Sequence, residues 1–83
     1  KWDEAKVACS NLGRGWRLPT KIELNILYRN RTKIGGFKKE AYWSSTGNVK
    51  DGEAWNQYFG ENIDNQYNSS MGVPMYVRAV RSF

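Results

Sequence analysis

The hydrophobic period of the chain changes near Phe37, and this change restricts the possible folds more than any other feature of the sequence. Before it, apolar residues recur at the spacing of a helix face. After it, short aromatic-rich runs alternate with turn-forming clusters at intervals of roughly 10 residues. The sequence therefore predicts an α+β domain in which two helices are followed by a small antiparallel sheet, a meander. The four predicted strands are Ala41–Ser45, Glu53–Phe59, Ile63–Tyr67 and Met75–Arg81.

The first predicted helix runs from Trp2 to Leu12, and Gly13 directly after it is a good left-handed terminator. Negative charge in its first turn suits the helix dipole. Its apolar residues share one face. They are Trp2, Ala5, Ala8 or Cys9, and Leu12.

The second helix has a clearer start, because Thr20 and Glu23 form a capping box. Pro19 prevents any upstream structure from continuing into it. An apolar stripe follows the box, and we expect the helix to end around Arg29–Arg31. The stripe consists of Leu24, Leu27 and Tyr28, with Ile22 and Ile26 nearby.

The length of 83 residues predicts one domain spanning residues 1–83. No apolar run approaches the roughly 20 residues of a membrane span. The chain opens at Lys1 without a Met, so we expect it to be a fragment of a longer protein.

A hairpin turn is predicted at Gly60-Glu61-Asn62. The expected core fillers include Trp16, Trp43 and Trp55.

The chemistry of the side chains argues against an enzyme. His is absent and Cys9 is the only cysteine, which removes Ser–His and Cys–His catalysis and the commonest zinc sites. We therefore predict no catalytic residues, no cofactor and no metal site. Cys9 is interpreted as a buried, inert thiol, with pairing to another molecule as the alternative. The nearest approach to a cation site is Glu61, Asn62, Asp64 and Asn65, which an ordinary polar turn also explains.

The net charge of +5 favours an anionic partner. Five cations lie within eleven residues that contain no acid, around a Gly-Gly pair. Such a loop could gather around the sulfate or carboxylate groups of a polyanion, with arginines making bidentate contacts. The alternative is that these cations complement a helix dipole and keep a small domain soluble. They are Arg29, Arg31, Lys33, Lys38 and Lys39.

Aromatic residues provide the second candidate site. Tyr58 and Tyr67 are expected to be exposed and to contact a ligand, whereas Trp43 and Trp55 are expected to be structural. The predicted loop Asn65–Gly72 carries amide and hydroxyl side chains that suit a neutral glycan, or that simply belong to a solvated loop.

A family resemblance connects these segments. The strings GWRLPT at 15–20, YWSST at 42–46 and YVRAVR at 76–81 occur in an order and spacing that resemble the C-terminal domain of the bacterial collagen-like adhesin Lcl. This family has long been classed as a domain of unknown function. The resemblance implies a C-type-lectin-like fold and a secreted or cell-surface location. Family members usually begin with a strand that is missing here, which would leave the Met75–Arg81 strand with a bare edge.

The resemblance also implies an adhesion or recognition role. The cysteine pair of the related formylglycine-generating enzymes and the calcium-binding tripeptides of calcium-dependent lectins are both absent. We interpret Arg17 and Arg78 as structural anchors. The favoured function is a non-enzymatic module that binds a glycan on a host or matrix surface, anionic or sulfated, strengthened by multivalency in an oligomeric parent. A protein–protein module is the alternative, and a nucleic-acid-binding domain is less favoured because no known motif supports it.

Overall fold

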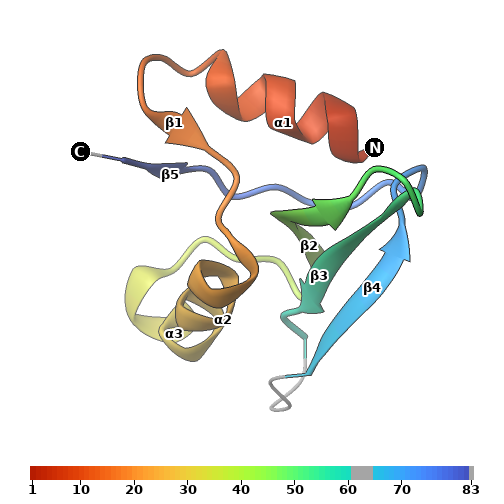
Figure 1. The fold of residues 1–83 in the computed structure, drawn as a ribbon. Coiled ribbons are helices and arrows are strands. Elements are labelled where there is room, and N and C mark those ends of the chain that lie inside the picture. Colours follow the sequence, from red (N-terminus) through yellow and green to blue (C-terminus); the bar gives the residue numbers. More distant parts are fainter. Residues whose placement is uncertain (61–64, 83) are drawn as a thin grey trace.

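Residues 1–60 and 65–82 are described by a computed structural model of the chain (Figure 1). Within these residues the protein is a small α+β domain with three helices and two antiparallel sheets. The predicted α+β class is therefore confirmed, with one short helix more than expected. The elements are α1 (Trp2–Ser10), β1 (Trp16–Arg17), α2 (Lys21–Arg29), α3 (Arg31–Ile34), β2 (Ala41–Asn48), β3 (Glu53–Tyr58), β4 (Gln66–Ser70) and β5 (Val80–Arg81).

The central sheet is the antiparallel meander β2-β3-β4, which agrees with the predicted meander over its first three strands. Tyr42 pairs with Gln57, and Asn56 pairs with Tyr67. The register of β2 against β3 shifts between Trp43 and Gly47, which indicates a bulge. Three antiparallel strands are thus present in chain order, as the turn spacing predicts.

The predicted fourth strand, Met75–Arg81, is wrong over most of its length. Only Val80–Arg81 forms a strand in this segment, and it pairs with β1, a short strand that the sequence pattern does not predict. Further upstream, Tyr76 makes a single parallel bridge to Tyr42 of β2. A parallel contact of one residue cannot extend the antiparallel meander, so this segment crosses the domain and joins a different sheet.

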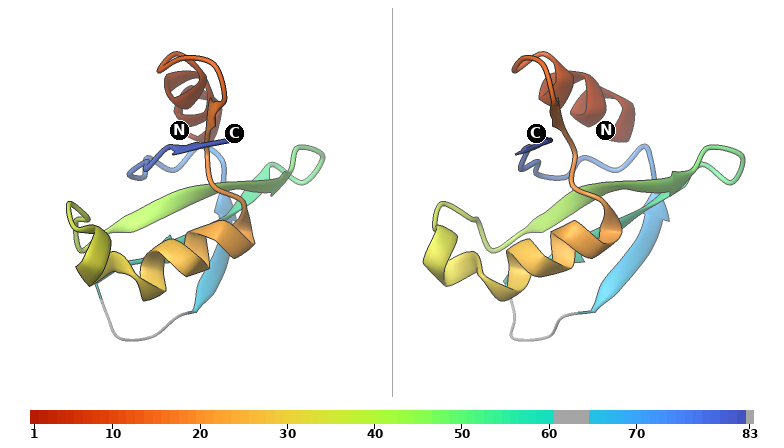
Figure 2. Two further views of the ribbon diagram at one scale, coloured as in Figure 1. Left: turned by 90° about the vertical axis from the view of Figure 1, so that its left-hand side faces the viewer. Right: turned by 60° about the vertical axis from the view of Figure 1, so that its left-hand side comes forward.

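The sheet separates two hydrophobic clusters because successive residues of β2 point to opposite faces. Trp43 faces α1 and packs with Trp2, Ala5 and Cys9. The preceding residue, Tyr42, faces α2 and packs with the second cluster. Figure 2 shows the resulting order of layers, with α1 and the C-terminal segment on one side of the sheet and α2 on the other. The second cluster consists of Leu24, Tyr28, Tyr42 and Phe59.

The first helix is shorter than predicted. It ends at Ser10, so Leu12 lies beyond its last turn and is 62% exposed. Ala8 is exposed as well, whereas Cys9 is almost completely buried and takes the place on the inner face. The buried residues Trp2, Ala5 and Cys9 keep the predicted spacing.

The second helix matches its prediction closely. The hydroxyl of Thr20 accepts a hydrogen bond from the Glu23 amide, and the Glu23 carboxylate accepts one from the Thr20 amide. Leu24 and Tyr28 are buried, and the helix ends at Arg29. Ile22 and Ile26 are exposed, because they lie outside the stripe that faces the sheet.

Two further predictions need correction. Of the strand predicted at Ile63–Tyr67, the residues Ile63 and Asp64 lie outside the described part of the chain. The described strand there is Gln66–Ser70, so the predicted loop Asn65–Gly72 is mostly strand. Among the expected core tryptophans, Trp43 is fully buried, whereas Trp16 and Trp55 are only half-buried. The predicted turn at Gly60-Glu61-Asn62 lies partly outside the described residues. No helix in the described part of the chain has the length and apolar character that crossing a membrane requires.

Candidate functional site

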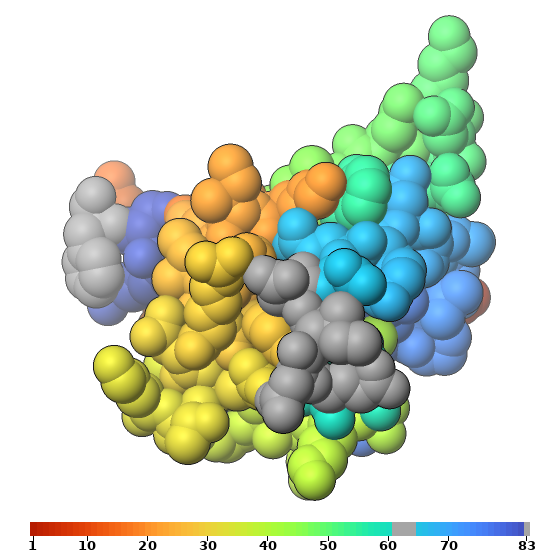
Figure 3. All heavy atoms as spheres, turned by 90° about the horizontal axis from the view of Figure 1, so that it is seen from below, coloured from red at the N-terminus to blue at the C-terminus, as the bar shows by residue number. Residues whose placement is uncertain are grey.

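The five predicted cations lie in one continuous stretch, from the last residue of α2 to the loop before β2. We call residues 29–39 the basic segment. Figure 2 places this stretch at the opposite end of the molecule from the β2–β3 turn, and Figure 3 shows it covering one side of the face seen from below. The structure therefore brings the five cations to one end of the domain.

The break between α2 and α3 sets the direction of the basic segment. Asn30 leaves the helical conformation, with φ −108° and ψ 14°, and its side-chain amide donates to the carbonyl of Ile26 at 2.9 Å. The chain then makes one more short helix, α3, and leaves it at Gly35 with φ 76° and ψ 170°. Few residues other than glycine adopt that backbone conformation.

Arg31 of the basic segment packs against Tyr28 at the end of α2. Its guanidinium carbon lies 4.0 Å from the centroid of the Tyr28 ring, and its Nη1 donates to the Tyr28 carbonyl at 2.8 Å. Because both contacts involve the same residue, the guanidinium is fixed over the end of α2 and is half-buried.

The loop that follows α3 is anchored by an aromatic side chain. The Phe37 ring stacks on Phe59, with centroids 4.8 Å apart, and meets Tyr42 edge-on at 5.5 Å. The hydroxyl of Tyr42 accepts a hydrogen bond from the Lys38 amide at 2.8 Å. These contacts fix the backbone that carries Lys38 and Lys39.

Arg78 fastens the same loop from the C-terminal segment. Its guanidinium lies over the Phe37 ring at 4.6 Å, and its Nη1 donates to the Gly35 carbonyl at 3.3 Å. This position confirms Arg78 as a structural anchor. It also adds a sixth positive charge beside the basic segment, which sequence spacing alone could not reveal because Arg78 lies 43 residues after Gly35.

The charge of the basic segment is directed mainly to solvent. The side chains of Lys33, Lys38 and Lys39 are exposed, and none of them forms an ion pair with another described residue. Glu40, the next residue along the chain, is exposed too. The lysines thus remain accessible to an external anion, whereas Arg31 and Arg78 take part in packing.

A hollow of about 260 Å³ opens between α3 and the loop. The basic segment contributes Arg31, Gly35 and Lys39 to its lining, among other residues. Phe59 of the second hydrophobic cluster also lines it. A concave surface with positive charge is the kind of geometry that selects a small anionic group.

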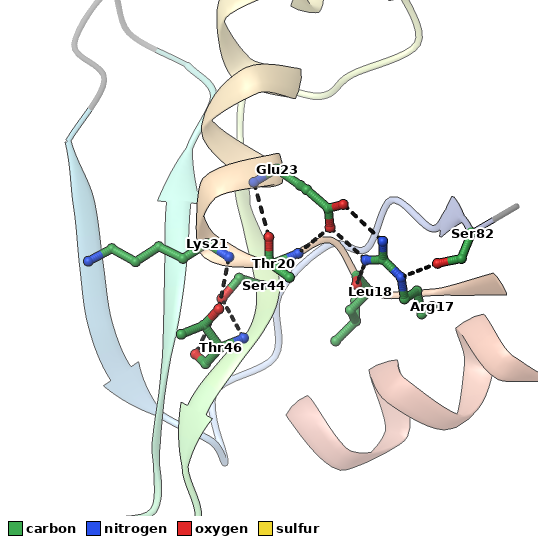
Figure 4. Close-up of polar contacts among 8 residues, drawn as sticks. All are labelled: Arg17, Leu18, Thr20, Lys21, Glu23, Ser44, Thr46 and Ser82. Atoms are coloured by element: carbon green, nitrogen blue, oxygen red, sulfur yellow. Dashed lines mark hydrogen bonds and ion pairs between the residues drawn. The ribbon is translucent and has the colours of Figure 1, made fainter. Parts of the chain in front are cut away.

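The other predicted anchor, Arg17, forms an ion pair with the Glu23 side chain (Figure 4). The guanidinium and the Thr20 amide donate to the Glu23 carboxylate and lower its pKa to about 2. The same hydrogen bond raises the pKa of Arg17. Arg17 also donates from Nε to the Ser82 hydroxyl and from Nη1 to the Leu18 carbonyl, so these contacts give it a structural role.

The two tyrosines of the predicted site lie on a different surface. Ala41 pairs with Tyr58 and Asn56 pairs with Tyr67, which puts both rings on the face of the sheet that points away from α2. They are exposed, at 38% and 51%, as predicted. The register therefore does not bring them together with the cations carried by α2 and α3.

The polar side chains expected to suit a neutral glycan are largely used inside the protein. The amide of Gln66 donates to the Lys21 carbonyl at 2.7 Å and to Gln57, and Ser69 accepts a hydrogen bond from Asn56. This arrangement weakens the neutral-glycan alternative. It follows from β4 being a strand and not a loop.

Trp55 is covered by a contact that no pattern in the sequence predicts. The ammonium of Lys21 lies 3.4 Å from the centroid of its ring. A helix that begins at Lys21 and packs on β3 is needed to bring them together, and no local pattern encodes that packing.

Residues 1–60 and 65–82 contain no group of three acidic or cysteine side chains that could hold a metal ion. Of the suggested cation cluster, Glu61, Asn62 and Asp64 lie outside the described residues. Cys9 is buried and free of a disulfide, and its burial raises the pKa of the thiol.

No known family model matches the chain, and no curated protein matches it.

Proposed function

We propose that this domain is a non-enzymatic recognition module that captures an anionic, sulfated polysaccharide through the basic segment. The observation that carries the proposal is that Lys33, Lys38 and Lys39 are exposed at one end of the molecule and form no ion pair with a described residue. Cations arranged in this way act through solvent on a polyanion and concentrate it at the surface.

The anchoring of the loop supports binding. The stacked Phe37 ring and the Lys38–Tyr42 hydrogen bond fix the backbone before a ligand arrives. Only the long lysine side chains then lose conformational freedom on binding, so the entropic penalty is limited to them. Binding by one domain is weak in such a system, and several copies in a parent protein would strengthen it.

The resemblance to the Lcl C-terminal family supports the same function. On this proposal the domain has a C-type-lectin-like fold and works in a secreted or cell-surface bacterial protein whose partner is a glycan of a host or matrix surface. The motif residue Trp43 is fully buried and Arg17 and Arg78 are anchors, so these matched positions maintain the fold and do not contact the ligand.

The direct test is retention on a heparin column with a salt gradient. Contacts between exposed charges are screened within roughly 10 Å at 0.1 M salt, so we expect retention at low salt and steep elution as salt rises. The variant K33E/K38E/K39E changes the net charge by −6, from +5 to −1, and should flow through. The matched control K1E/R14E/K50E has the same net charge but alters exposed cations outside the basic segment, and it should keep most of the retention.

Two outcomes would contradict the proposal. Wild-type protein in the void volume at low salt would exclude charge capture. Equal loss of retention in both triple variants would show that net charge acts without a site. Single- and double-stranded oligonucleotides in a gel shift test the nucleic-acid alternative, and binding tighter than that to heparin would favour it.

A protein-binding function is the second candidate, and one surface favours it. The crossing C-terminal segment leaves Val73 and Tyr76 exposed next to a hollow of about 300 Å³ lined by Ala41, Pro74 and Met75. Partly apolar hollows of this kind occur in protein interfaces. A V73D variant that keeps heparin retention but no longer forms a complex with a protein partner would assign a separate role to this surface.

A further inference from the structure

The hollow between α3 and the loop of the basic segment has two cationic side chains in its lining, Arg31 and Lys39. Its aromatic lining is largely covered, because Phe59 is only 3% exposed and the half-buried Phe37 ring has Phe59 stacked on it and the Arg78 guanidinium over it. The hollow therefore offers a ligand positive charge and only a small apolar surface.

The hydrogen-bonding capacity of the lining points to a hydroxylated ligand. Thr32 contributes an exposed hydroxyl from α3, which can donate and accept. Arg31 supplies positive charge to the lining, in an orientation fixed by its contacts with Tyr28. Lys39 is exposed, and its flexible side chain can follow an anion at the rim.

Gly35 also lines the hollow. A side chain there would meet no atom within 4 Å, so crowding does not require a glycine at this position. The requirement is the backbone conformation, φ 76° and ψ 170°, which is nearly restricted to glycine and which turns the chain away from α3.

We propose that this hollow is a subsite for one sulfated sugar unit, with the sulfate at the Arg31 and Lys39 side chains and a sugar hydroxyl at Thr32. The volume of the hollow, about 260 Å³, lies just below the ~300–1,000 Å³ range of small-molecule pockets, so the hollow holds a single sugar unit. The rest of the polysaccharide passes over the surface lysines. This inference rests on the proposed function and adds a selective position to it.

The test uses monosaccharides, which cannot bridge the whole basic segment. N-acetylglucosamine 6-sulfate, added to ¹⁵N-labelled protein at millimolar concentration, should shift the amide signals of Thr32, Gly35 and Gly36. Unsulfated N-acetylglucosamine should not shift them, and glucuronic acid tests whether a carboxylate replaces the sulfate. Lys39→Ala should weaken binding of the sulfated sugar about tenfold, because it removes a charged hydrogen-bond donor.

Lys33→Ala is the matched control, since it removes the same charge from an exposed lysine of the basic segment that does not line the hollow. It should leave the monosaccharide shifts unchanged, although both variants should lower heparin retention. If heparin binds but the sulfated monosaccharide gives no shifts at the hollow, or if Lys33→Ala and Lys39→Ala weaken it equally, the subsite is overturned and the proposed function stands. If heparin does not bind, the proposed function fails, whatever the monosaccharide does.

Discussion

Arg17 and Glu23 form two parallel hydrogen bonds, Nη1 to Oε1 at 2.6 Å and Nη2 to Oε2 at 2.8 Å. The same carboxylate accepts the Thr20 amide at 2.8 Å, so one side chain caps α2 and ties it to β1. Because β1 pairs with β5, this carboxylate also connects α2 to the C-terminal end of the domain.

The Glu23 carboxylate should make stability depend on pH. Its pKa of about 2 lies below the ordinary value near 4.3 that it has in the unfolded chain. Its contribution is therefore complete above about pH 5 and is lost as pH falls through 4 to about 2. The pair is more than one-third exposed, so solvent screening limits that contribution to about 1 kcal/mol.

Glu23→Gln isolates this contribution, because glutamine still completes a capping box. Urea unfolding at pH 7 should show a loss of about 1 kcal/mol, and the variant and the wild type should converge near pH 2. Glu40→Gln, which changes an exposed carboxylate, serves as the control and should leave stability unchanged. A constant difference between the Glu23 variant and the wild type at all pH values would contradict the assignment.

Arg78 should control the order of the loop and not the stability of the whole domain. Arg78→Ala removes both the stacking on Phe37 and the hydrogen bond to Gly35. We expect the Lys38 amide, which donates to Tyr42, to exchange with solvent several-fold faster, while the urea midpoint changes little.

Arg78→Lys distinguishes the planar guanidinium from its charge. Lysine keeps the charge but not the flat stacking surface, so exchange at Lys38 should stay fast. Recovery of the wild-type exchange rate in Arg78→Lys would mean that charge alone holds the loop.

Two buried tryptophans should respond differently to the same substitution. The indole N–H of Trp2 donates to the Ser44 carbonyl at 2.8 Å, whereas that of Trp43 has no hydrogen-bond partner in the described structure. Trp2→Phe removes a hydrogen bond to a buried carbonyl, and Trp43→Phe removes an unpaired donor. Thermal and urea unfolding should therefore show Trp2→Phe to be the more destabilising by about 1 kcal/mol or more. The opposite order would contradict this reading of the core.

Local chemistry explains which parts of the fold could be predicted. The Thr20–Glu23 capping box and the Leu24/Tyr28 stripe depend on residues within one helix, and the structure reproduces both. The strand runs that include Trp43 and Trp55 alternate with turn residues, and they form β2 and β3. Helix ends and buried faces of this kind are encoded by neighbours in the sequence.

Long-range packing explains the errors. Tyr76 through Val80 has the composition of a strand, but β2 offers Tyr76 only a one-residue parallel bridge, and the pairing partner of Val80 is Arg17. The candidate site shows the same division. The run of cations is visible in the sequence, whereas Arg78 beside Gly35 and the hollow between α3 and the loop require the folded chain.

Cys9 should be nearly unreactive in the native protein. It is 1% exposed and its burial raises the pKa of the thiol, so little thiolate is present at neutral pH. A thiol-specific colorimetric reagent should label it slowly in buffer and at once in urea. Rapid labelling without denaturant would show that α1 opens readily.

The turn that joins β2 to β3 lies at the opposite end of the molecule from the basic segment in both views of Figure 2. It is closed by its own bonds, since the Asn48 carbonyl accepts the Gly52 amide and the Asn48 side chain donates to Asp51. With Cys9 buried, Lys50→Cys would create a single reactive thiol at this turn. Coupling through that thiol would fix the domain on a bead, a chip or a designed scaffold in one orientation, with its lysines turned outward.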